Sequence, residues 1–300
     1  MDRILVLGKI NMDIAVRVKQ FPKGNEEIQM TDTWQRTAGS GYEICHFLKH
    51  FSVPCDVCSP VGQGVYAEEI REKLDDSFIR IPSAQMNGCS YTMIDAEGKI
   101  QTMFVQGGES DWTGITEVLS DLNPYSAVVV DGSVLIDNEQ VIQLLEEYDG
   151  QIVLCLDEES VYMDMDILNE LLLKDPVIHL TENAAIALCD SEDLEEIGET
   201  LKGITENEIV VLGNDLSALY IHGDDKVYQA SSPGKHKDMS GVSETHLAAY
   251  ITAIYSGLRT EKALSFAGSC ASLLASSYRT VFSDKEINLQ KNLMITSIMK

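Results

Sequence analysis

The chain is poor in positive charge. Its 300 residues include 22 lysines and arginines against 48 aspartates and glutamates, giving a formal net charge of −26. A protein of this sign repels nucleic acid backbones and anionic lipid surfaces, which argues against either as a partner. An anionic ligand would need a local patch of positive charge. The segment Lys235, His236 and Lys237 is the candidate for that patch.

Long apolar runs and export signals are also missing. No run approaches the roughly 18 apolar residues of a membrane-spanning helix. The N-terminus, MDRILVLGKI, has an acid at its second position and an apolar stretch too short for a signal peptide. We therefore expect a cytoplasmic protein whose first strand lies near Ile4.

Cysteines are present, but in an odd number. The chain has seven, spread through apolar segments, which fits reduced core thiols better than disulfides. Cys55 and Cys58 form a CxxC pair, yet no second pair or histidine cluster accompanies it. We predict neither zinc nor redox chemistry there, and no metal site.

No internal repeat, low-complexity tract or linker divides the sequence, so we expect a single domain over residues 1–300. Continuously apolar strands alternate with helices, which indicates a mostly parallel sheet covered on both faces, an α/β three-layer sandwich. The expected strands are 4–8, 56–60, 127–131, 152–156, 177–180 and 208–212. The expected helices are 42–51, 65–75, 138–147, 165–174, 194–202, 242–256 and 261–277.

Some stretches depart from this alternation of apolar strands and helices. Residues 26–36, 90–94 and 100–105 alternate between polar and apolar side chains, as half-buried antiparallel strands do. We predict a small β-lid inserted at 25–37 and 88–106. In open α/β sheets, ligands bind at the carboxyl ends of the strands, so the polar segments at those ends are the candidate binding segments.

The first such segment is Gly8-Lys9-Ile10-Asn11-Met12-Asp13. Asn11 and Asp13 are two residues apart, so an extended chain would point both to one side. An amide and a carboxylate suit the vicinal hydroxyls of a polyol. Alone, the segment is equally typical of a polar exit from a strand.

The second segment, Thr37-Ala38-Gly39-Ser40-Gly41, precedes an expected helix, where glycines let the backbone approach a ligand and the helix start adds donors. It is not a P-loop, because no Gly-Lys-Ser/Thr follows. No strand is followed by a GxGxxG fingerprint, which argues against an NAD-dependent oxidoreductase.

The third segment, Asp238 to Glu244, opens a long apolar helix. Gly241 would let a phosphate approach the free amides of the first turn, and Glu244 would lie close enough to take a proton from an attacking hydroxyl. The competing interpretation is a helix capped by Ser240 or Ser243 with an acid in its first turn.

In combination, these residues resemble the ribokinase-like (PfkB) carbohydrate kinases. That family has a G-x-x-N-x-D segment after its first strand, a glycine-glycine motif before its first helix, and a D-T-x-G-A-G-D motif at a late helix. Gly8–Asp13, Gly39–Gly41 and Asp238–Glu244 occur in that order, with the lid between. The resemblance implies a Rossmann-like sandwich with a β-lid and transfer of the ATP γ-phosphoryl group to a sugar hydroxyl.

The resemblance also implies roles for particular residues and the use of ATP with Mg²⁺. Glu244 would be the catalytic base, and the residues after Asp238 would form the anion hole. The implied anion-hole residues are Gly241, Val242 and Ser243; the implied substrate-binding residues are Asn11, Asp13, Gly39, Ser40 and Glu43; and the implied nucleotide-binding residues are Thr181, Gly213 and Asp238.

Several positions depart from the family pattern. Val242, Ser243 and Glu244 replace Ala, Gly and Asp of the last motif, and Glu43 stands where Asn is usual. The N-x-x-E motif falls on 181–184 without matching it, and the T-L-G turn becomes Val211-Leu212-Gly213. The leading hypothesis is an ATP-dependent sugar or polyol kinase. The alternative is a non-catalytic sugar- or metabolite-binding relative. Exposed lid edges also predict a homodimer.

Overall fold

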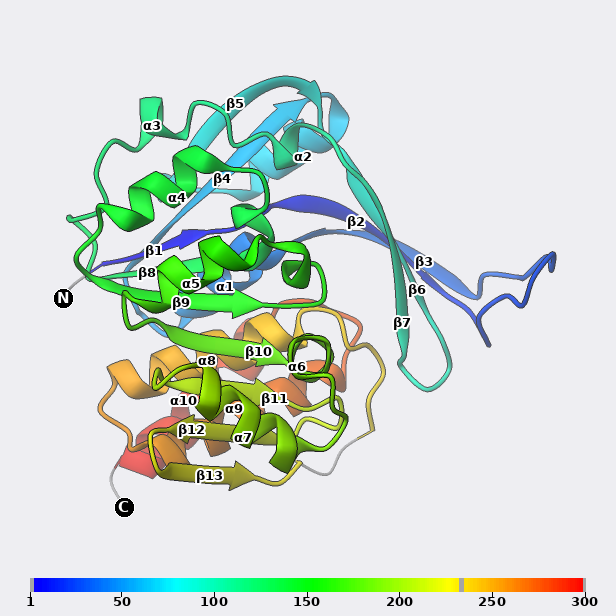
Figure 1. Ribbon diagram of the computed structural model, residues 1–300. Helices are drawn as coiled ribbons and strands as arrows, with labels where there is room; N and C mark the ends of the chain where they lie inside the picture. The colour runs from blue at the N-terminus through cyan, green and yellow to red at the C-terminus, as the bar shows by residue number, and fades with distance from the viewer. Residues whose placement is uncertain (1–2, 232–234, 299–300) are drawn as a thin grey trace.

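The computed structural model describes residues 3–231 and 235–298 and has two sheets. The larger has nine strands in the order β13-β12-β11-β10-β9-β8-β1-β4-β5 (Figure 1). From β11 to β5 all neighbours are parallel, whereas β12 and β13 add an antiparallel edge. The bounds are β1 (Ile4–Leu7), β4 (Cys55–Gln63), β5 (Phe78–Met86), β8 (Ala127–Asp131), β9 (Gln151–Leu156), β10 (Val177–Thr181), β11 (Ile209–Leu212), β12 (Ala218–His222) and β13 (Asp225–Gln229).

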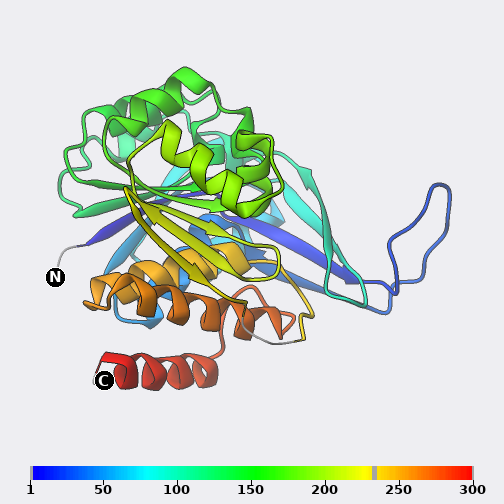
Figure 2. The ribbon, with the colours of Figure 1, turned by 60° about the horizontal axis from the view of Figure 1, so that its bottom comes forward.

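Helices cover both faces of this sheet, which gives three layers (Figure 2). One face carries α3 (Ile115–Val118), α4 (Glu139–Glu146), α5 (Met165–Leu172), α6 (Glu182–Cys189) and α7 (Leu194–Ile204). The other carries α1 (Ser40–His50), α2 (Val65–Lys73), α8 (Val242–Tyr255), α9 (Thr260–Ala275) and α10 (Asp284–Ile298). The predicted three-layer α/β sandwich is therefore confirmed.

The continuous apolar strands are explained by this double covering. In β1, Ile4 and Val6 belong to the core under α1 and α8, whereas Leu5 and Leu7 belong to the core under α4 and α5. Because successive side chains point to opposite faces of a sheet, a strand buried on both faces needs apolar residues at every position.

The smaller sheet is the lid, which projects from one end of the main sheet (Figure 1). Its order is β3 (Asp32–Ala38), β2 (Asn11–Arg17), β6 (Cys89–Ile94) and β7 (Ile100–Val105). Two details differ from the prediction. Residues 25–31 are not strand, and β2, which was not expected as a lid strand, pairs in parallel with β6. The pairing is parallel because β2 continues from β1 and β6 follows β5. Strands β1 and β5 run in the same direction, so the chain leaves the main sheet at the carboxyl ends of both.

Each expected helix is present, with ends within two residues of those predicted. Sequence patterns missed α3, α6, α10, and strands β5, β12 and β13. Helix α6 was missed because it begins at once after β10, with Thr181 serving as both the last strand residue and the helix cap. No loop signal separates the two elements.

All seven cysteines are free thiols, six of them buried, as expected. Cys55 lies on β4 with its Sγ atom 3.1 Å from that of Cys45 on α1. Within residues 3–231 and 235–298, no group of three or more histidine, cysteine or acidic side chains is placed to hold a metal ion. A search of the same residues finds no helix with the length and apolar content that crossing a bilayer requires.

Candidate functional site

Two glycine contacts join the segment after β1 to the start of α1. The Gly41 amide donates to the Lys9 carbonyl at 3.1 Å, and a Cβ on Gly39 would lie 2.5 Å from that same carbonyl oxygen. Gly39 also has φ of 102°, which side-chain-bearing residues rarely adopt. Glycine is therefore required here by close packing and by backbone conformation. The result is that Asn11 and Ser40 lie at the wall of one cavity.

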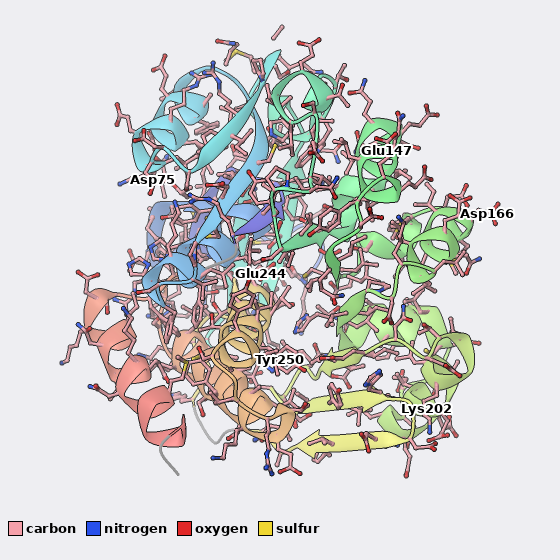
Figure 3. The ribbon with its side chains drawn as sticks, turned by 90° about the vertical axis from the view of Figure 1, so that its left-hand side faces the viewer. Asp75, Glu147, Asp166, Lys202, Glu244 and Tyr250 are labelled. Carbon is pink, nitrogen blue, oxygen red and sulfur yellow. The ribbon has the colours of Figure 1, made fainter. Side chains whose placement is uncertain are left out.

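This cavity has a volume of about 180 Å³ and lies where the lid meets the carboxyl ends of β1, β8 and β9. Four of the predicted site residues line it: Asn11, Gly39, Ser40 and Glu244. Its other lining residues are Lys9, Cys89, Phe104, Val105, Gln106, Glu109, Ser110, Asp131, Ser133, Asp157 and Glu159. Figure 3 shows Glu244 near the middle of the molecule.

Asp131 and Asp157 were not singled out from the sequence, although a signal was available. Each is the first acid at the end of a continuously apolar strand. The Ser40 hydroxyl donates to Oδ2 of Asp131, and the Ser133 amide donates to Oδ1 at 2.9 Å. Burial raises the pKa of Asp131, and the nearby charge of Asp157 raises it further.

Lys9 is the one lysine or arginine among the residues that line the cavity. Its Nζ lies 3.2 Å from Oε1 of Glu159 and 3.4 Å from Oε2. The ion pair with Glu159 therefore neutralises the positive charge of Lys9. The expected patch at Lys235 to Lys237 contributes no lining residue to this cavity.

Glu244 lies in the first turn of α8. Burial raises its pKa to about 7; its own backbone amide opposes the shift, and the charges of Asp157 and Asp131 add to it. A carboxyl group of this pKa is half deprotonated near neutral pH, which suits a general base.

The start of α8 has no side-chain cap. Gly241 is the N-cap residue, in the left-handed conformation with φ of 72°, and the hydroxyls of Ser240 and Ser243 have no hydrogen-bond partner among the described residues. The interpretation of a serine-capped helix is therefore wrong. Among the described residues, no backbone carbonyl outside the helix accepts from the Ser243 or Glu244 amide. The Ser243 amide is part of the positive end of the helix dipole, a setting that favours an anion, whereas the Glu244 amide is bonded to its own carboxyl group.

Asp13 and Asp238 share one arginine, Arg36 on β3. Arg36 Nε lies 2.8 Å from Asp13 Oδ2, and its NH1 lies 2.7 Å from Asp238 Oδ2. Both carboxylates are almost fully buried, with exposures of 3% and 0%. Asp13 also accepts from the hydroxyls of Ser90 and Thr92, at 2.8 and 2.7 Å. The structure thus places Asp13 and Asp238 in a buried ion-pair network that ties the lid to the segment before α8, and neither lines the cavity.

Glu43 is buried behind the α8 start. A Cβ on Gly241 would come within 2.9 Å of Glu43 Oε2, so glycine at 241 also avoids a clash with this carboxyl group. Burial holds the pKa of Glu43 well above its usual range, and the charge of Glu244 adds to the shift. Glu43 and the predicted anion-hole residues Gly241, Val242 and Ser243 do not line the cavity either.

Thr181 and Gly213, two of the three predicted nucleotide-binding residues, lie at the ends of β10 and β11. The Thr181 hydroxyl accepts from the Ala184 amide at 3.2 Å, and the Gly213 amide donates to the Ser217 carbonyl at 2.8 Å. Next to Thr181, Glu182 Oε2 accepts from the Asn214 amide at 2.6 Å.

Asn183 completes this network. It donates to Glu158 at 2.6 Å and accepts from Asn214 Nδ2 at 3.0 Å. The polar groups here are bonded largely to one another.

The fold and the position of the cavity define the ribokinase-like class. The family model for pfkB family carbohydrate kinases matches residues 1–287, and the chain belongs to that family. It is 25% identical over 291 residues to a ribokinase of Arabidopsis thaliana, with 90% of this chain and 75% of the relative covered. An uncharacterized sugar kinase of Escherichia coli (strain K12) is 22% identical over 287 residues, with 90% and 87% covered.

Solved structures agree on the fold. The ribokinase of Thermotoga maritima superposes with a TM-score of 0.78 at 16% identity, covering 97% of this chain and all of the other. The Arabidopsis thaliana ribokinase complexed with ribose and ATP gives a TM-score of 0.74 at 19% identity, covering 97% and 98%. At these identities the likeness establishes the fold alone.

Proposed function

We propose that this chain is an ATP-dependent kinase that transfers the γ-phosphoryl group to a hydroxyl of a sugar or related polyol. The observation that carries the proposal is the position of Glu244. Its carboxyl group lines the cavity, and its helix begins with amides that have no side-chain cap. A base and an anion-binding helix start are therefore adjacent, as phosphoryl transfer requires.

In the proposed mechanism, the acceptor hydroxyl lies in the cavity next to Glu244. Glu244 takes the hydroxyl proton as the oxygen bonds to the γ-phosphorus, and the bond from that phosphorus to the bridging oxygen breaks to release ADP. The amides at Gly241, Val242 and Ser243 stabilise the charge on the transferred group. Asn11 and Ser40, which line the same cavity, orient the acceptor.

In this proposal, the protein provides a site for the phosphates of ATP but no cluster of its own for Mg²⁺ among the described residues. The α8 start has no side-chain cap, which fits an approaching phosphate. No described cluster of side chains fits a metal ion. Because protein-bound Mg²⁺ is commonly held by phosphates and one or two carboxylates, the metal would come with the nucleotide.

Calorimetric titration of ATP, with and without Mg²⁺, tests the nucleotide half of the proposal without any choice of sugar. We expect binding in the micromolar to millimolar range that depends on Mg²⁺. A screen of acceptors for stimulated ADP release then tests the transfer. Absence of ATP binding, both alone and with each acceptor present, would reject the kinase.

That rejection would favour the second candidate, a binding protein that has lost phosphoryl transfer. The specific observation in its favour is the network around Asn183, which uses up the polar groups at the expected nucleotide side. Such a protein would bind polyols in the cavity with no effect of ATP on affinity.

A homodimer through the lid is part of the same proposal. β7 is an edge strand of the lid, and Met103, Phe104 and Val105 on it are more than half exposed. Unpaired edges and contiguous exposed apolar side chains favour association. Sedimentation velocity at micromolar concentration is expected to show a dimer, and Met103→Lys is expected to weaken it. A monomer in the unmodified protein would reject this part alone.

A further inference from the structure

The cavity wall is unusually rich in hydrogen-bond acceptors, and this bears on which molecule the proposed kinase phosphorylates. Five carboxyl groups line the cavity, against the single lysine already paired with Glu159. The five are Glu109, Asp131, Asp157, Glu159 and Glu244.

Some of these carboxyl groups are satisfied within the protein. Glu109 accepts from the amides of Gly88 and Gly107 at 2.6 and 2.8 Å. Asp131 accepts from Ser40 and Ser133. Their role is to hold the loops of the wall together.

Other acceptors remain open toward a ligand. Asn11 Oδ1 is buried without a hydrogen-bond partner in the part of the chain that the structure describes. No described side chain donates to the carboxyl group of Glu244, and the bonds to Asp157 all reach Oδ1, leaving Oδ2 free among the described contacts. A buried acceptor without a donor is costly, so the wall favours a ligand that brings several donors.

The form of the wall argues for an organic cation and against a bare metal ion. Within the described residues, the carboxyl groups do not converge in a metal-binding arrangement. They are spread along a cavity of about 180 Å³. This is well below the roughly 300–1,000 Å³ of sites for drug-sized ligands, which favours a single small polyol over a nucleoside.

We propose that the acceptor is a small amino polyol, with its protonated amine held by Asp157 and a hydroxyl directed to Glu244. This inference rests on the proposed function and narrows its substrate class. Without a metal ion to offset its charge, a phosphorylated sugar is disfavoured, because that charge meets four further acidic residues around Glu244; the phosphates of ATP would enter with Mg²⁺.

Three matched three-carbon probes test the inference: 2-amino-1,3-propanediol, glycerol and glycerol 2-phosphate. Each is small enough for the cavity whatever the natural substrate is, and the amine is protonated at neutral pH. Binding to the full chain is measured by ligand-observed NMR at low salt, without ATP. We expect the aminodiol to bind about tenfold more tightly than glycerol, and no binding of the phosphate.

Charge variants separate the cavity from the generally acidic surface. Asp157→Asn keeps the Oδ1 acceptor that its loop uses and removes one charge from the wall. Asp166→Asn makes the same change on the exposed outer side of the molecule, far from Glu244 (Figure 3). We expect the first to reduce the amine preference several-fold and the second to leave it unchanged.

The inference would be overturned by equal binding of aminodiol and glycerol, by no measurable binding of the aminodiol at millimolar concentration, or by an equal loss in the two variants. Loss of the preference on adding millimolar Mg²⁺ would assign the carboxyl groups to the metal and overturn it too. The kinase proposal is tested by separate measurements, ATP binding and acceptor-stimulated ADP release, so its failure can be told apart from failure of the amino polyol. A neutral sugar phosphorylated without amine preference would leave the kinase standing and reject the amino polyol.

Discussion

The two ends of the candidate site use polar side chains in opposite ways. At the ends of β1, β8 and β9, the cavity wall keeps acceptors open, among them Asn11 Oδ1 and the Glu244 carboxyl group. At the ends of β10 and β11, Asn183 and its neighbours are bonded to one another.

The difference shows why a list of motif residues is not a list of ligands. A side chain with all its hydrogen bonds made inside the protein stabilises local structure and has little left for a substrate. Asp13 and Asp238 illustrate this, because Arg36 and nearby hydroxyls take up their oxygens. Open, buried acceptors mark where recognition is expected. The predictions below test that distinction.

The largest effect is expected from Glu244→Gln. The amide cannot take the hydroxyl proton, so the rate of ADP release should fall by about 10²–10⁴-fold, the usual contribution of a general base. In the unmodified protein the rate should rise with pH through about 7 as Glu244 deprotonates, and the variant should lose this dependence. Glu147→Gln, on an exposed residue, is the matched control. Equal turnover in Glu244→Gln and the unmodified protein would remove Glu244 as the base.

Next in size is Arg36→Met. It leaves Asp13 and Asp238 buried without their shared cation, which is expected to cost about 3–5 kcal/mol in the free energy of unfolding. Denaturant titration measures the loss. Arg80→Met on the exposed side of β5 should change stability by less than about 0.5 kcal/mol. If both variants lose the same stability, the buried network is not what joins the lid to the α8 segment.

A smaller, pH-dependent effect is expected from Glu43→Gln. The folded state holds the Glu43 pKa well above its usual value, so the stability from this carboxyl is full below the ordinary pKa of about 4.3 and is lost as pH rises through the folded pKa. Glutamine stays neutral and avoids that loss.

Thermal unfolding of Glu43→Gln checks this. Its Tm should exceed that of the unmodified protein at pH 8, by about 2–4 °C for each kcal/mol gained, and the gap should close toward pH 4. A gap that is constant with pH would show that Glu43 does not titrate on unfolding.

The smallest effect is expected from Asn183→Ala. This side chain is exposed, so loss of its bonds to Glu158 and Asn214 should cost no more than about 1 kcal/mol of stability. If the network serves only local structure, ATP affinity measured by calorimetry should change little. A large loss of affinity would instead make Asn183 a nucleotide ligand.

Much of the fold could be predicted because its signals are local. Apolar strands such as Ile4–Leu7 need no partner to be recognised, and the ends of the expected helices differ from prediction by two residues at most. Some misses occurred where local signals are absent. Thr181 ends a strand and caps a helix with no loop between, and the lid strand Asn11–Arg17 is recognised only through its pairing with β6.

The candidate site was predictable in part. The order of the glycine segments correctly indicated the carboxyl ends of the strands, and Asn11, Gly39, Ser40 and Glu244 line one cavity there. The ion pairs of Arg36 could not be predicted from the sequence, because its two partners lie 23 and 202 residues away in the chain. Asp131 and Asp157 carried only the weak signal of an acid at the end of an apolar strand.

The sequence by itself determined the alternation of strands and helices, the surplus of acidic residues and the family, since these depend on residue type and order along the chain. Only the tertiary structure decided which carboxyl groups are free. Whether an acid binds a ligand or stabilises the fold depends on which donors lie within about 3 Å of it, and those donors come from distant segments. That is why Asp13 and Glu244, both acids in family motifs, meet such different surroundings.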